Sequence, residues 1–142
     1  DQAALLDHAL AGRLSSEVTT LLSPFDPVVW DRQRSRELFN FDYTIECYTP
    51  AAKRKFGYFT LPILHRGQLV GRIDPKAHRS RGVFEVKSIH LEENISPDDD
   101  LTVSLAAALN KLARWHDTPE LILQPSGSVD FIKAVQLASN RP

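Results

Sequence analysis

The chain has 142 residues, of which 42% are hydrophobic and 25% charged, a length that supplies one hydrophobic core and excludes two large ones. Its formal charge is −1, and its single cysteine, Cys47, excludes an internal disulfide and fits a reduced cytosolic setting. The sequence has no membrane-spanning apolar run and no zinc-ligand spacing, and its amino end lacks the basic-then-apolar order of a signal peptide. We therefore expect a soluble cytoplasmic monomer without membrane, metal or cofactor.

The amino end predicts a separate element. Residues 1–15 are expected to form a helix or the tail of a preceding domain, because apolar residues recur at helical spacing over 3–11 and Gly12 stands where a helix would end. The chain begins at Asp1 and contains no methionine, which predicts a fragment of a longer protein. Residues 16–142 are predicted to form one domain.

Four strands are predicted in the middle of this domain, after a proline-interrupted loop and a short helix capped by Asp31. From residue 42 the hydrophobic period changes to two, with strands expected at 42–48, 58–64, 69–73 and 83–91. Arg66-Gly67 is expected to close a tight hairpin, since glycine accepts the positive φ that such turns require. Four consecutive antiparallel strands form a meander, the usual start of a small β-barrel.

Residues 96–142 predict two helices with a short strand between them. Ser96-Pro97-Asp98-Asp99 combines an N-cap, a proline at the first helical position and carboxylates beside the positive end of the helix dipole. Residues 121–123 read as a buried strand, and Ser128 as the cap of the last helix. The predicted fold class is therefore α+β, a small antiparallel barrel or meander with flanking helices. The apolar stripe expected on the first helix comprises Leu101, Leu105, Leu109, Leu112 and Trp115 or His116.

Positive charge is concentrated in one segment. Between Pro50 and Arg81 there are eight basic residues and one acid, Asp74, so a chain of charge −1 encloses a segment of charge +7. Such a footprint favours a polyanion as partner, although solvated loops without a ligand are the alternative. The basic residues are Lys53, Arg54, Lys55, Arg66, Arg72, Lys76, Arg79 and Arg81.

Several pieces of the sequence resemble one bacterial family, the winged-helix DNA glycosylases of the YcaQ-like group. The pieces are Leu21-Leu-Ser-Pro-Phe-Asp-Pro-Val-Val-Trp-Asp31, Phe41-Asp-Tyr43, Tyr48-Thr-Pro-Ala-Ala-Lys-Arg54, Gly57-Tyr58, Leu61-Pro-Ile-Leu-His65 and Leu69-Val-Gly-Arg72 with Asp74 and Lys76. These enzymes remove bulky alkylated bases and unhook interstrand crosslinks. The resemblance covers most of residues 16–95 and rests on layout after Ser96.

The resemblance implies the β-barrel end of a protein in which tandem winged-helix units come first. Its catalytic pair, Gln-hydrophobic-Gln or Gln-hydrophobic-Asp, is expected upstream, because no glutamine here has Gln or Asp two residues later. The implied role is the DNA-binding part of a monofunctional glycosylase, inactive alone, acting on alkylated or crosslinked duplex in the bacterial nucleoid. Two alternatives stay open: a DNA-binding or regulatory module without glycosylase chemistry, and a protein-interaction domain with an acidic partner.

With this resemblance the eight basic residues are predicted to contact DNA phosphates. Arg72 and Asp74 share a strand face, either as an arginine aimed at DNA and held by the acid or as an ordinary surface pair. Alternation places Phe59 in the core and leaves Tyr58 as a candidate for base stacking. The predicted accessory contacts are His65, His78, Tyr58 and Asp74.

Two other features have both a functional and a structural interpretation. Residues 98–100 are three consecutive aspartates, which would suit the metal ligands of a nuclease. The simpler explanation is that their negative charge stabilises the start of a helix. The Pro24–Pro27 loop suits an active-site entrance. A structural role is favoured, because Asp26 is placed to accept from nearby backbone N–H groups and Phe25 to plug a barrel end.

Overall fold

The computed structural model describes residues 17–141, so the helix or tail predicted for residues 1–15 lies outside the described residues. The fold is α+β, as predicted. Its elements are β1 (Thr19–Leu21), α2 (Pro27–Trp30), α3 (Arg32–Phe39), the 3-10 turn η1 (Ala51–Lys53), β2 (Leu61–His65), β3 (Gln68–His78), the 3-10 turn η2 (Arg79–Arg81), β4 (Val83–Leu91), α4 (Asp99–Trp115), β5 (Glu120–Leu123) and α5 (Val129–Ser139).

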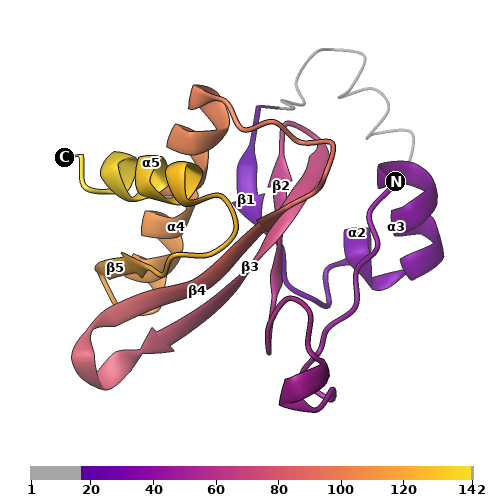
Figure 1. Cartoon of the computed structure of the whole chain (residues 1–142), viewed down its shortest axis with the longest axis horizontal. Coiled ribbons are helices and arrows are strands. Elements are labelled where there is room, and N and C mark those ends of the chain that lie inside the picture. The colour runs from indigo at the N-terminus through magenta and orange to yellow at the C-terminus, as the bar shows by residue number, and fades with distance from the viewer. Residues whose placement is uncertain (1–16, 142) are drawn as a thin grey trace, which may run out of the picture.

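The five strands form one curled sheet in the order β1-β2-β3-β4-β5, an open half-barrel (Figure 1). The first four strands are antiparallel neighbours, and β5 pairs with β4 in parallel. The predicted meander is confirmed for its last three strands, β2 to β4. A connection through α4 makes this last pairing possible, because parallel neighbours require a long crossover. The helices α4 and α5 cover one face of the sheet, while α2 and α3 lie on the opposite side of the molecule.

Both faces of the central strands are buried. Ile63 and Ile73 point into a core shared with α4 and α5, whereas Leu64 and Leu69 point into a second core around Phe41. This double burial explains why β3 is buried over most of its length instead of alternating with exposed residues. The larger core is completed by side chains from both helices, principally Leu101, Leu105, Leu109, Phe131, Ile132 and Val135.

The first predicted strand is wrong. Residues 42–48 form an irregular segment, and the strand that pairs with β2 is β1. Alternation along 42–48 would place Tyr43 and Glu46 on opposite faces of a strand, yet both side chains are buried, so the segment does not alternate. The next predicted strand also begins later, at Leu61, which leaves Phe59 partly exposed instead of in the core.

The carboxyl-terminal elements follow the prediction with two corrections. The N-cap of α4 is Asp98, whose carboxylate accepts from the Leu101 N–H at 2.8 Å, and not Ser96. Of the two aromatic candidates at the end of its apolar stripe, His116 packs on the Phe84 ring, whereas Trp115 is 74% exposed. In the described part of the chain, no helix is both long and apolar enough to cross a membrane.

Candidate nucleic-acid interface

The eight predicted phosphate contacts do not form one cluster. β3 has eleven residues, which at roughly 3.3 Å per residue is a span of about 35 Å. Arg66 precedes β3 at one end of the strand. At the other end β3 is followed by the 3-10 turn η2, which we call the basic turn because it contains Arg79 and Arg81. Figure 1 shows this basic turn at the tip of a long arm formed by β3 and β4, at the end of the sheet away from the β2–β3 turn.

At the β2–β3 turn, the basic side chains pair with an acid of α4 at the surface. The Arg66 Nε lies 2.8 Å from a carboxylate oxygen of Asp100 in the first turn of α4. His65 Nε2 lies 3.4 Å from the same oxygen, and its Nδ1 is hydrogen-bonded to the Thr19 hydroxyl at 2.7 Å. These contacts tie α4 to the sheet. They also give Asp100 a structural partner, and no cluster of potential metal ligands occurs among residues 17–141.

Arg72 is a core residue, and the two predicted roles at the surface are wrong for it. Its side chain is 3% exposed, and its guanidinium lies 4.5 Å from the Phe41 ring centre and 4.2 Å from that of Phe56. One amino group donates to the Asp42 carbonyl at 3.0 Å and the other to Glu92 at 2.7 Å. The segment 40–60 lies over this face of the sheet, and its aromatic rings enclose the charge.

Asp74 is also buried and does not pair with Arg72. Its two carboxylate oxygens accept from the backbone N–H groups of Tyr58 at 3.2 Å and Phe59 at 3.4 Å. Gly57 has φ +143°, and a Cβ at that position would overlap the Asp74 carboxylate, so the loop comes this close only with glycine. Asp74 therefore holds the loop on the strand, which is a structural role.

Glu46 holds the same loop from the other side. Its carboxylate accepts from three consecutive backbone N–H groups, those of Lys55 at 2.8 Å, Phe56 at 2.7 Å and Gly57 at 3.2 Å. Burial alone would raise the pKa of Glu46, but these hydrogen bonds outweigh it and lower the pKa below its ordinary value. Nothing in the local sequence pattern marks Glu46, because its partners lie nine to eleven residues further along the chain.

We call residues 48–59 the anchored loop, because Glu46 and Asp74 bind five of its consecutive backbone N–H groups. It presents Lys53 and Lys55 to solvent. Arg54 is partly buried: its Nε donates to the Thr49 carbonyl at 2.8 Å, and its guanidinium lies 4.9 Å from the Tyr58 ring centre. The sequence analysis placed these cations between two predicted strands. In the structure, hydrogen bonds to Glu46 and Asp74 fix the backbone of this segment.

The anchored loop lies beside the β3–β4 arm. The Ser88 hydroxyl on β4 donates to the Phe56 carbonyl at 3.2 Å, and Asp74 on β3 is only two residues from the exposed Lys76. Figure 1 shows both in the lower half of the view, away from the β2–β3 turn, with the arm tip at the left and the loop to the right of the centre. The structure thus leaves six of the eight predicted cations on the loop and the arm: Lys53, Arg54, Lys55, Lys76, Arg79 and Arg81.

Internal contacts shape the arm near its tip. His78 Nε2 is 2.7 Å from a Glu85 carboxylate oxygen, and the hydrogen bond from His78 lowers the pKa of that carboxyl. Arg79 lies 3.3 Å from His116 Nδ1. The pKa of His116 is lowered, mainly by burial of the ring and to a smaller extent by the charge of Arg79. His78 is therefore bound to a neighbouring strand residue, while Lys76 and Arg81 face solvent.

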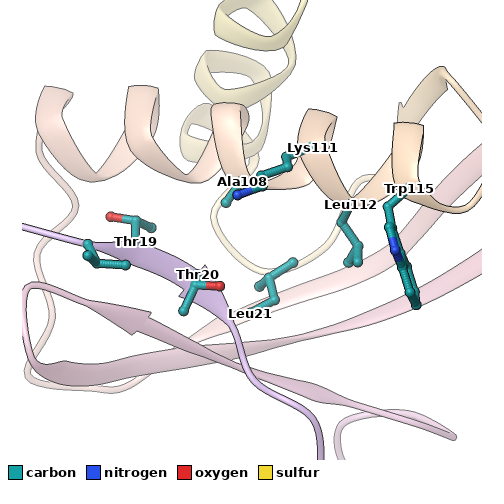
Figure 2. Close-up of a pocket in the computed structure, with 8 residues that line it drawn as sticks. Thr19, Thr20, Leu21, Ala108, Lys111, Leu112 and Trp115 are labelled. Carbon is teal, nitrogen blue, oxygen red and sulfur yellow. The ribbon is translucent and has the colours of Figure 1, made fainter.

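The lining of one apolar pocket includes none of these cations. This pocket has a volume of about 310 Å³ and lies between β1 and α4, with Trp115 at one end (Figure 2). Thr19, Thr20, Leu21, Ala108 and Leu112 contribute to its walls, and among residues 17–141 Lys111 is the one ionisable side chain that lines it. The part of its lining that the structure describes contains no pair of acid and base groups of the kind that an active site uses.

The anchoring by Glu46 predicts a pH dependence of stability. A carboxyl whose pKa is lowered in the folded state stabilises the fold above its ordinary pKa of about 4.3, and this contribution is lost as the pH falls through the folded pKa. We expect Glu46→Gln to flatten the decrease in the free energy of unfolding below about pH 5, measured by urea titration. Glu37→Gln on exposed α3 is the matched control, and an equal effect of both changes would contradict the anchoring role.

Comparison with known protein families identifies the class to which this protein belongs. Residues 1–115 match the family model described as DNA glycosylase AlkZ-like, and β5 and α5 follow the matched part. The chain belongs to the AlkZ-like family of DNA glycosylases, which confirms the resemblance seen in the sequence. Its function is therefore related to DNA glycosylases, whose substrate is DNA. Among solved structures, none matches the chain.

Proposed function

We propose that this chain is the DNA-binding part of a monofunctional DNA glycosylase that hydrolyses the N-glycosidic bond of alkylated or crosslinked bases. In this proposal the anchored loop and the β3–β4 arm hold the phosphodiester backbone, and an upstream Gln-hydrophobic-Gln or Gln-hydrophobic-Asp pair positions the attacking water. Alkylation at a ring nitrogen makes the base a good leaving group, so positioning of water and charge outweighs strong acid catalysis.

One observation carries this proposal: cations stand on a loop whose backbone is already fixed by Glu46 and Asp74. A fixed loop loses little conformational entropy when it binds, so more of the electrostatic attraction appears as affinity. Lys53, Lys55 and Lys76 are exposed and form no ion pair with another described residue. Each phosphate they neutralise would release condensed counterions.

The proposal predicts the salt dependence of DNA binding. Six phosphate contacts give a slope of about −5 in a plot of log affinity against log salt, at about −0.9 per contact. Replacing Lys53, Lys55 and Lys76 together by alanine should reduce this slope by about 3, as measured by fluorescence anisotropy with a duplex. The matched control replaces three exposed cations elsewhere, namely Lys111 on α4, Lys133 on α5 and Arg141 just after α5. This triple variant should leave the slope unchanged.

Two results would contradict this assignment. Equal slopes for the two triple variants would show that the charges act only through the overall field of the protein. An undetectable affinity at low salt would instead favour a protein partner for the basic surface. For the chemistry, we expect the 142-residue chain alone to release no base from alkylated duplex, while a longer protein that includes the catalytic pair releases it.

A further inference from the structure

The anchored loop exposes aromatic side chains next to its cations. Tyr48 is 93% exposed, Tyr58 52% and Phe59 38%, and all three lie within twelve consecutive residues. We call these three residues the aromatic edge. Alternation in the sequence placed Phe59 in the core, but β2 begins only at Leu61, so the structure leaves Phe59 beside Tyr58 at the surface.

The backbone that bears the aromatic edge is held in place. The N–H groups of Tyr58 and Phe59 are bound by Asp74, and the three preceding N–H groups by Glu46. The Arg54 guanidinium lies over the Tyr58 ring and is itself held by the Thr49 carbonyl, which limits the motion of the ring. These contacts position the backbone of both residues and the ring of Tyr58 in advance, so ordering them on binding costs little entropy.

The chemistry of this edge suits nucleobases. A rigid aromatic ring stacks on any base, because every base has a π-face, and an arginine behind the ring adds a cation–π contribution. The neighbouring cations Lys53 and Lys55 suit the phosphates on either side of such a base. Bases within an intact duplex are already stacked on their neighbours, so only a base that has left the stack offers a free face.

We propose that the aromatic edge stacks on an unstacked base of distorted DNA, with Tyr58 and Phe59 as the contacting rings. The inference rests on the proposed function, since it requires DNA at the anchored loop. It goes further because it gives the two groups of side chains different roles. The cations bind the phosphates of any DNA, whereas the aromatic edge makes the protein prefer DNA that contains an unpaired base. The loop then distinguishes damaged from intact duplex independently of the hydrolysis.

The test compares two DNA molecules. One is an intact duplex, and the other is the same duplex with a two-nucleotide bulge that contains 2-aminopurine. The combined variant Tyr58→Ala, Phe59→Ala should lose roughly tenfold to a hundredfold in affinity for the bulged duplex, and its affinity for the intact duplex should stay within about twofold. Binding of the unmodified protein should quench the 2-aminopurine fluorescence, and the variant should not. Tyr58→Trp should retain the preference, because it keeps an aromatic face.

Trp115→Ala is the matched control, since it removes an exposed ring from another part of the surface. Equal losses on both DNA molecules would overturn the inference, as would an unchanged preference for the bulge. A lower melting temperature of the double variant without a change in preference would show that the rings pack against another part of the protein, which also overturns it. If the unmodified protein binds neither DNA, the proposed function fails as well, so the two failures are distinguishable.

Discussion

Replacing Arg72 by alanine is expected to lower the free energy of unfolding by about 3 kcal/mol. The guanidinium lies between the rings of Phe41 and Phe56 and donates to Asp42 and Glu92. Its loss leaves a cavity between the rings and removes the partner of a half-buried carboxylate. Urea titration followed by circular dichroism measures this effect.

Arg79→Ala is the matched control for Arg72→Ala. Arg79 is exposed at the arm tip, so its removal should change stability by less than about 0.5 kcal/mol. The two arginines should also differ in DNA binding: Arg79→Ala should weaken it, whereas folded Arg72→Ala protein should keep the salt slope of the unmodified protein. A stable Arg72→Ala variant with a reduced slope would restore the original prediction of Arg72 as a phosphate contact.

Gly71→Ala is expected to destabilise the protein by about 3 kcal/mol, for a steric reason. Gly71 lies on β3 opposite Leu91 on β4, and a Cβ at this position would overlap the carbonyl oxygen of His90 and lie 3.0 Å from the Leu91 Cα. These are backbone atoms of a paired strand, which cannot move aside without breaking the ladder. The measurement is again the urea midpoint, together with the melting temperature.

Gly82→Ala separates this steric effect from backbone strain. Gly82 has φ +67° at the arm tip and no heavy atom within 4 Å of an added Cβ, so alanine should cost only about 1 kcal/mol, from the left-handed conformation. If Gly71→Ala proved as mild as Gly82→Ala, β3 and β4 would have to separate more easily than their paired register suggests.

The burial of Arg72 and Glu46 could not be predicted from local patterns. Period-two alternation states which side chains share a strand face, but it does not state whether another segment covers that face. Arg72 bonds to Asp42, thirty residues earlier, and Glu46 bonds to Phe56, ten residues later. Both residues look like ordinary surface charges in the sequence, and both become structural only when the segment 40–60 lies over the sheet.

A β-bulge shows the same limit in the sheet itself. The register between β2 and β3 shifts at Leu64, so Ile63 faces Gly71 while Leu64 faces Leu69. The extra residue at this point is Val70, which joins the same core as Ile73, although alternation placed them on opposite faces. A bulge depends on how two strands fit together, and neither strand signals it alone.

The sequence by itself determined the α+β class, the antiparallel run of β2, β3 and β4, the two carboxyl-terminal helices and the glycosylase family, because these depend on periodicity, caps, turns and the order of motifs. The Arg66-Gly67 turn is an example, with φ +48° and +78° as a tight hairpin requires. Only the tertiary structure decided which of the eight cations remain available to a ligand, because availability depends on which distant segment covers each side chain. It buried Arg72, paired Arg66 with Asp100, and left the anchored loop and the arm exposed.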